Sequence, residues 1–285
     1  MEHQYRVVDV FTEKPLEGNP LAVFPDAAGL DSSTMQSIAR ELNLSETVFI
    51  LPATRPDCSA RLRIFTPSRE MDFAGHPTVG GSFVLLDTGM VSKHSETFVV
   101  EENVGPVPIR VDKGERPLIW LTTPPIKDGP TFDRGLCAGV LGLGPEDLLD
   151  FPPQVLSAGN PTIFIALKDR ETVDRAEMDM SGAKRLRGTH PQPLCTFVFT
   201  PTAEGAYSRM FAPEHGVMED PATGSATGPL AAYMMRHKLT PGERFRSEQG
   251  TKMRRRSILH VHMHDGAIDV GGYVTPLVRA VMELS

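Results

Sequence analysis

The sequence has few cysteines and no long apolar run, and each shortage removes a class of protein. Only 3 of the 285 residues are cysteine, and Cys58, Cys137 and Cys195 lie far apart, without a CxxC pair or the ligand spacing of a zinc site. We therefore expect neither a disulfide framework nor a metal site built on thiols, and we expect these thiols to be buried. No run of about 18 uncharged apolar residues occurs. The first residues carry charge where a signal peptide would be apolar, so we expect a cytoplasmic protein with no membrane partner.

Positive charge and the common nucleotide motifs are also scarce. Lys and Arg number 29 against 36 Asp and Glu, which gives a net charge of −7, the wrong sign for a general nucleic-acid binder. No Gly-Lys dipeptide occurs, so a Walker A loop is excluded, and the GxGxxG fingerprint is missing as well. The GxSxG and HExxH motifs of common hydrolases are absent too. Nothing in the sequence therefore calls for a nucleotide or metal cofactor, and no nucleic-acid partner is expected.

Three short segments recur in the same order at nearly constant spacing, which indicates a duplicated half of about 140 residues. The offsets are 141 (159 − 18), 146 (209 − 63) and 149 (224 − 75). The paired segments are Gly18-Asn19-Pro20 with Gly159-Asn160-Pro161, Arg63-Ile64-Phe65-Thr66-Pro67 with Arg209-Met210-Phe211-Ala212-Pro213, and Gly75-His76-Pro77-Thr78-Val79-Gly80 with Gly224-Ser225-Ala226-Thr227-Gly228. A segment rich in proline and glycine at 123–130 separates the halves. We expect two lobes, residues 1–125 and 126–285, with the last strand able to return to the first lobe.

The hydrophobic pattern predicts an α+β fold in both lobes. Short segments with alternating or β-branched residues predict strands; they are 6–11, 47–51, 60–65, 97–101 and 118–121. Residues 33–42 form an amphipathic helix pattern, whereas 77–86 is apolar nearly all round and ends before Gly89. Residues 229–236 repeat that apolar character in the second lobe. We therefore expect each lobe to be a curved, mostly antiparallel sheet around one central apolar helix.

Both apolar helices begin in glycine-rich turns, at Gly75 and at Gly224. The first N–H groups of a helix have no intrahelical acceptor and carry the positive end of the helix dipole, so they attract anions. If a pseudo-two-fold axis relates the lobes, the two helix starts face one another across a cleft and can bind a small carboxylate. Taken singly, each turn is better explained as an ordinary helix N-terminus, and it is the duplicated context that favours an anion site.

Several polar residues near these turns could carry acid–base chemistry. His76 and Asp220 stand beside the two helix starts, and Ser225 offers a hydroxyl. Glu46 lies at the mouth of the apolar strand 47–51, although a carboxylate there is also typical of a surface or turn-capping residue. His76 could equally hydrogen-bond within its own turn.

A second histidine group lies near the C-terminus. His260, His262 and His264 alternate along a predicted strand and share one of its faces. Three imidazoles could hold a metal ion. An ordinary half-exposed strand explains the pattern as well, and we do not predict a metal site from it.

Four motifs in order resemble the PhzF-like family of phenazine biosynthesis proteins. They are Gly18-Asn19-Pro20-Leu21-Ala22-Val23-Phe24, Asn43-Leu44-Ser45-Glu46-Thr47-Val48-Phe49, Arg63-Ile64-Phe65-Thr66-Pro67 with Phe73-Ala74-Gly75-His76-Pro77-Thr78, and Glu219-Asp220-Pro221-Ala222-Thr223-Gly224-Ser225-Ala226. The resemblance implies lobes of the diaminopimelate-epimerase type, a homodimer and isomerisation without a cofactor. The substrate it implies is a small carboxylic acid like trans-2,3-dihydro-3-hydroxyanthranilate.

The resemblance also implies roles for individual residues. Glu46 matches the glutamate that moves the proton, and His76 and Asp220 match catalytic neighbours, Asp220 either orienting His76 or relaying a proton. The residues expected to bind substrate are Asn19, Gly75, Pro77, Gly224 and Ser225. The epimerase relatives use one cysteine at each helix start, but Cys58, Cys137 and Cys195 lie in neither turn, so a two-thiol mechanism is not expected.

Two other functions remain open from the sequence. The chain could be a member of the fold that binds a small molecule or a protein without catalysis. It could also be an epimerase or racemase that works without cysteine, with Glu46 opposed by Asp220.

Overall fold

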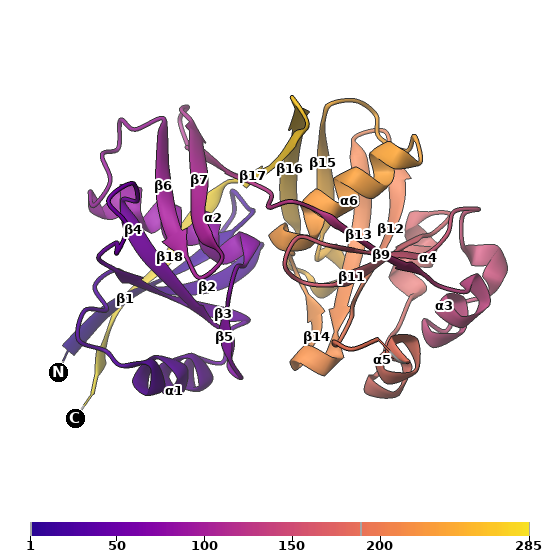
Figure 1. Ribbon diagram of the computed structural model, residues 1–285, viewed down its shortest axis with the longest axis horizontal. Coiled ribbons are helices and arrows are strands. Elements are labelled where there is room, and N and C mark those ends of the chain that lie inside the picture. The colour runs from indigo at the N-terminus through magenta and orange to yellow at the C-terminus, as the bar shows by residue number, and fades with distance from the viewer. Residues whose placement is uncertain (1, 189, 285) are drawn as a thin grey trace. The chain divides into compact units, whose positions relative to one another are not determined.

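The computed structural model describes residues 2–188 and 190–284 (Figure 1). Two units are distinguished: Met1–Thr122 with Gly271–Ser285, and Thr123–Val270. The first boundary falls directly before the expected linker at 123–130. The last 15 residues group with the N-terminal unit, because β18 (Val274–Glu283) pairs antiparallel with β1 (Glu2–Val10).

The N-terminal unit is a mixed sheet with two helices. Its other elements are β2 (Asn19–Phe24), α1 (Ser32–Leu42), β3 (Glu46–Leu51), β4 (Ala60–Phe65), β5 (Glu70–Met71), α2 (Gly75–Thr88), β6 (Thr97–Glu102), β7 (Gly105–Asp112) and β8 (Leu118–Thr122). Most neighbouring strands are antiparallel, whereas β2 with β3 and β4 with β6 are parallel.

The C-terminal unit contains the remaining elements. They are β9 (Lys127–Thr131), α3 (Arg134–Val140), β10 (Gln154–Ser157), β11 (Thr162–Ala166), α4 (Arg170–Arg175), α5 (Met180–Arg187), β12 (Cys195–Thr202), β13 (Gly205–Ala212), β14 (Val217–Asp220), α6 (Gly224–Arg236), β15 (Arg244–Gln249), β16 (Ser257–His264) and most of β17 (Ala267–Gly272), with 3₁₀ turns at Pro145–Asp147, Pro213–His215 and Thr251–Met253. Here β11 with β12 and β13 with β15 are parallel.

Helix α2 is buried along nearly its whole length and packs against strands β1, β2, β3, β4, β8 and β18 of its own unit (Figure 1). Two adjacent glycines allow this close approach. A Cβ at Gly80 would lie 2.5 Å from Leu21 Cδ2, and one at Gly81 would lie 3.1 Å from Leu62 Cδ1. Gly89 ends the helix in the left-handed conformation at φ 77°, as predicted.

Helix α6 has the corresponding place in the C-terminal unit, where it packs on β10, β11 and β16. Strand β11 is buried throughout because both of its faces are covered. Phe164 packs in the cluster that includes Tyr233 of α6, while Ile163 and Ile165 pack in the cluster that includes Leu186 of α5. The helix begins at Gly224, in the glycine-rich turn where its start was predicted, five residues before the apolar segment 229–236. Proline usually begins a helix, but Pro229 lies inside this one.

The two units repeat one pattern of strand pairing, and the predicted α+β fold built twice is confirmed. In each, the second and third strands of the repeat are parallel, and the helix start follows a short hairpin. Each hairpin carries the same bidentate ion pair. Arg63 binds Glu70 at 2.8 and 2.6 Å, and Arg209 binds Glu219 at 2.8 and 2.9 Å.

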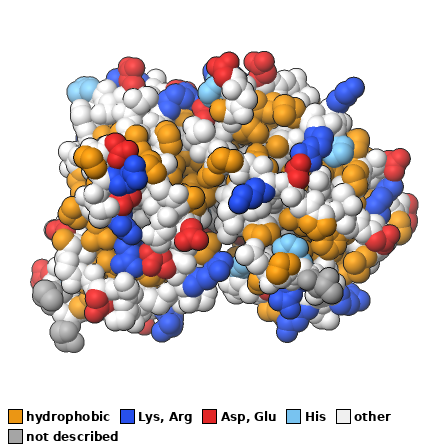
Figure 2. All heavy atoms as spheres, viewed as in Figure 1, with side chains coloured by type: hydrophobic (Ala, Val, Ile, Leu, Met, Phe, Trp, Pro, Cys, Tyr) orange, Lys and Arg blue, Asp and Glu red, His pale blue; other side chains and the backbone are white. Residues whose placement is uncertain are grey.

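Basic side chains stand among acidic ones on the face seen in Figure 2. Within residues 2–188 and 190–284, no helix combines the length and apolarity needed to span a membrane. Cys137 and Cys195 are buried as expected, but Cys58 is partly exposed because it lies in the loop before β4.

Candidate active site

Three of the predicted site residues meet in the N-terminal unit. Glu46 begins β3, His76 is the second residue of α2, and Asn19 begins β2. His76 Nε2 lies 3.4 Å from Glu46 Oε2, and His76 Nδ1 lies 3.3 Å from Asn19 Nδ2. The side chain of Glu46 is 17% exposed, whereas His76 and Asn19 are buried. The partly exposed Glu46 carboxylate thus lies beside the buried imidazole of His76, and Asn19 contacts the opposite nitrogen of that ring.

The imidazole of His76 is neutral at physiological pH. Burial lowers the pKa of His76 to about 3. The Glu46 carboxylate acts in the opposite direction, since a nearby negative charge favours imidazolium, but burial dominates. The Asn19 Nδ2 group can only donate, so His76 Nδ1 accepts and the ring proton lies on Nε2. That proton faces Glu46, and the pair is a neutral donor beside a carboxylate rather than an ion pair.

The start of α2 provides further donors beside this pair. Its N-cap is Ala74, which has no side-chain oxygen to bind the first N–H groups. Thr78 N closes the first turn on Ala74 O at 3.2 Å. Pro77 has no N–H, so the donors of this turn are those of Gly75 and His76. Gly75 and Pro77 are both buried.

The predicted residues of the C-terminal unit gather around the start of α6. Asp220 ends β14 and is 7% exposed; its Oδ2 accepts a hydrogen bond from Thr223 Oγ1. Gln249 Nε2 donates to Asp220 O at 2.7 Å and to Thr223 Oγ1 at 3.0 Å, while Thr223 N donates to Gln249 Oε1. Gly224 is buried and Ser225, in the first turn, is partly exposed. This network holds the Asp220 carboxylate beside a helix N-terminus, where negative charge is stabilised.

Glu102 is a buried acid at the start of α2 that we did not predict. It ends β6 and is 3% exposed. Its Oε1 lies 2.6 Å from Thr78 Oγ1, and the same hydroxyl lies 2.7 Å from Ala74 O. A hydroxyl has one proton, and a carbonyl can only accept. Thr78 therefore donates to Ala74, and the carboxyl group of Glu102 must supply the proton of the other bond.

Glu102 is accordingly a protonated acid, and burial raises its pKa to about 8. The repeat offers an independent check. Gln249 ends β15 as Glu102 ends β6, and the parallel pairings of Glu101 with Arg61 and of Glu248 with Tyr207 place the two residues at corresponding positions, at an offset of 147 (249 − 102). A neutral amide stands where the first unit has a neutral acid. Extending the repeat through residue 102 would have revealed this pair from the sequence.

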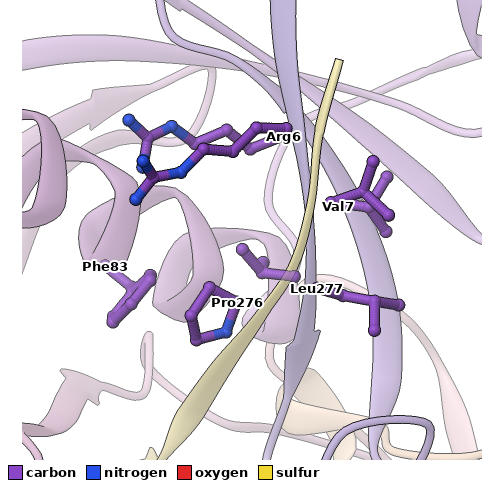
Figure 3. A pocket seen from close by; sticks show the side chains of 8 residues that line it. Arg6, Val7, Phe83, Pro276 and Leu277 are labelled. Carbon is purple, nitrogen blue, oxygen red and sulfur yellow. The ribbon is translucent and has the colours of Figure 1, made fainter.

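Two further carboxylates near the helix starts, and a hollow in the N-terminal unit, are not part of this group of residues. Asp72 is exposed, and Glu219 is engaged by Arg209. The hollow of about 320 Å³ shown in Figure 3 lies between β1, β18 and α2, where Arg6, Phe83 and Pro276 line it. None of the predicted site residues lines that hollow.

Comparison with known proteins agrees with this description. The family model for phenazine biosynthesis-like proteins matches residues 8–278. The chain is 34% identical over 286 residues to a trans-2,3-dihydro-3-hydroxyanthranilate isomerase of Pseudomonas aeruginosa, covering 95% of each chain. A solved PhzF-family protein of Bacillus anthracis superposes with a TM-score of 0.87 at 25% identity, covering 100% of both chains.

A more distant likeness concerns the fold alone. A probable proline racemase of Agrobacterium radiobacter superposes with a TM-score of 0.67 at 15% identity, covering 99% of this chain and 93% of the other. The predicted epimerase-like architecture and the predicted family are therefore both confirmed. The chain belongs to the phenazine biosynthesis-like, or PhzF-like, family and is an isomerase of that type.

Proposed function

We propose that this isomerase moves a proton between carbon atoms of a small cyclic or conjugated carboxylic acid, with Glu46 as the acid–base group and without a cofactor. The substrate class is that of trans-2,3-dihydro-3-hydroxyanthranilate, on which a relative of 34% identity acts by its name. The observation that carries the proposal is the partly exposed Glu46 carboxylate, 3.4 Å from the neutral, buried His76.

The chemistry follows from these groups. The Glu46 carboxylate takes a proton from one carbon, and the electron pair of the broken C–H bond moves into the conjugated system as a dienolate. The N–H groups of Gly75 and His76 stabilise the developing negative charge, because they are fixed before the reaction begins. The protonated Glu46 then returns the proton to a different carbon. His76 Nε2–H faces the carboxylate and orients it, while Asn19 fixes the ring by its donation to Nδ1.

Asp220 and Ser225 are proposed as further groups that act on the substrate, with Gly224 binding it. Support comes from the second helix start, which repeats the first and holds the Asp220 carboxylate in a network with Thr223 and Gln249. Asp220→Asn should therefore lower turnover while leaving the fold intact. A cytoplasmic homodimer remains part of the proposal, and sedimentation of the purified protein tests the dimer.

The decisive experiment follows proton exchange in heavy water. The protein is incubated with trans-2,3-dihydro-3-hydroxyanthranilate in D₂O, and carbon-bound deuterium is measured by mass spectrometry. Glu46→Gln keeps the size of the side chain and removes its titrating proton, so we expect turnover to fall at least about 100-fold. The control is Glu41→Gln, an exposed glutamate of α1, which should retain full turnover.

Three other results of this experiment would point to a different function or a different acid–base group. Wild-type turnover in Glu46→Gln would refute its role as the acid–base group. Binding of the acid without any deuterium incorporation would indicate a non-catalytic binder. Inversion of a stereocentre without a shift of a double bond would indicate an epimerase.

A further inference from the structure

We propose that His262, His264 and Asp269 bind one divalent transition-metal cation, of which Zn²⁺ is the representative. Each residue offers one ligand atom, and the three atoms lie within 4.8 Å of one another. The histidines come from β16 and the aspartate from β17, which are neighbouring strands of the C-terminal unit (Figure 1). The sequence suggested three histidines on one strand; the structure replaces His260 with an aspartate from the next strand.

The backbone brings the two imidazoles together. Residues two apart on a strand share a face and are separated by about 6.5–7 Å along it. The rings of His262 and His264 incline toward each other, with centroids 4.6 Å apart. The connecting turn, Asp265-Gly266, has φ of 48° and 77°, the positive pair typical of a tight type I′ hairpin. A short turn of this kind leaves the two strands little freedom to shift.

The carboxylate supplies the charge that a cation site needs. Asp269 is 4% exposed, and its Oδ2 lies 2.9 Å from His264 Nε2. Buried carboxylates are normally paired or coordinate metals. Exposed Asp265 adds a second negative group, 3.8 Å from His264 Nδ1. Arg244 stands opposite His262 in the β15–β16 pairing and offsets part of this charge.

The ligand atoms must move before they can share one cation: they lie within 4.8 Å of one another, so the widest contact closes by up to about 1.5 Å to reach the tetrahedral spacing. Tetrahedral ligands at about 2.0–2.1 Å from Zn²⁺ lie about 3.3 Å apart. The His264–Asp269 contact must therefore open by about 0.4 Å, and the side chain of His264, which is 38% exposed, has room to turn. Two imidazoles and one carboxylate suit borderline cations such as Zn²⁺, and water would complete the coordination.

The test is a calorimetric titration of metal-free protein with ZnCl₂ at pH 7.5. Every sample carries Cys58→Ser, so that the partly exposed thiol does not contribute. We expect one saturable site, and we expect His262→Ala and His264→Ala each to weaken it at least about tenfold. The matched control is His260→Ala, on the same strand face but outside the cluster, which should leave the affinity unchanged.

A second measurement identifies the ligands. Co²⁺ in the same site should show visible d–d bands without a thiolate-to-cobalt charge-transfer band. His260→Ala should leave this spectrum unchanged. Absence of saturable binding would overturn the proposal, leaving the cluster as a metal-free histidine–aspartate hydrogen bond. Equal affinity in all three alanine variants would overturn it as well, because the cation would then lie elsewhere.

Discussion

Replacing Glu102 by glutamine should change how the stability of the protein depends on pH. The pKa of Glu102 is raised by burial to about 8 in the folded protein, against an ordinary value of 4.5. The folded state thus holds a proton that the unfolded state releases above pH 4.5. Its contribution is fully present below pH 4.5 and is lost progressively as the pH rises to 8. Each unit of pKa difference corresponds to about 1.4 kcal/mol, so the wild type should lose about 4 kcal/mol from this group between pH 5 and pH 9.

The glutamine variant should not show this loss, because an amide has no proton to release. Its Nε2 can donate to Thr78 Oγ1 as the acid does, but its second N–H is left without a defined partner at a cost of about 1–3 kcal/mol. Glu102→Gln should therefore be the less stable protein at pH 5 and the more stable one at pH 9. The free energy of unfolding, measured by urea denaturation at a series of pH values, gives the difference curve.

The adjacent Glu101 is the matched control. Its carboxylate accepts hydrogen bonds from Thr54 and Arg55, which lower the pKa of Glu101. Glu101→Gln should thus destabilise the protein near neutral pH and give no gain at pH 9. Parallel curves for wild type and Glu102→Gln from pH 5 to pH 9 would refute the assignment of Glu102 as a protonated acid.

Three further substitutions test the packing of the helices. Gly80→Ala should destabilise the protein by about 1–3 kcal/mol, because its Cβ would overlap Leu21. Gly139→Ala should instead stabilise it by about 0.5–1 kcal/mol, because Gly139 lies on the exposed side of α3 with open space around it. Urea denaturation of both variants measures the contrast. Tyr233→Phe removes the donor to Pro152 O, 2.9 Å away in the core, and should lower the free energy of unfolding by about 1–3 kcal/mol, a loss that a thermal melt would show as a reduced Tm.

The helices that the sequence predicted well are those whose pattern is local. Helix α1 was predicted at 33–42 and is found at Ser32–Leu42, because Asp31 caps its first turn and Asn43 ends it in the left-handed conformation. The apolar run after His76 predicted α2 for the same reason. Helix α6 begins at Gly224 as predicted, but its apolar pattern was recognised only from Pro229, a residue type that usually starts a helix and here lies inside one. Burial by distant strands overrides that local preference.

Three residues that the motifs named lie together in the structure, but their protonation could not be predicted. Glu46, His76 and Asn19 were named from motifs, and their residue types alone could not show that the ring is neutral or which nitrogen carries the proton. Both follow from burial of His76 and from the donor on Asn19, which lies 57 residues earlier in the chain. Glu102 and Asp269 were missed because their partners come from other strands, and a charge in isolation is typical of a surface.

The two halves of the repeat share one frame but differ in their polar residues. The arginine–glutamate pair stands in both hairpins, and the two central helices begin at matching positions. Ala74 and His76 of the first helix start correspond, at the offset of 149, to Thr223 and Ser225 of the second. In the first unit the N-cap carries no hydroxyl and a buried imidazole faces a carboxylate; in the second the N-cap hydroxyl binds the carboxylate of Asp220. The arginine–glutamate pair and the helix start are thus kept in both units because they fix the backbone of the turn, whereas the groups that face each helix start have diverged.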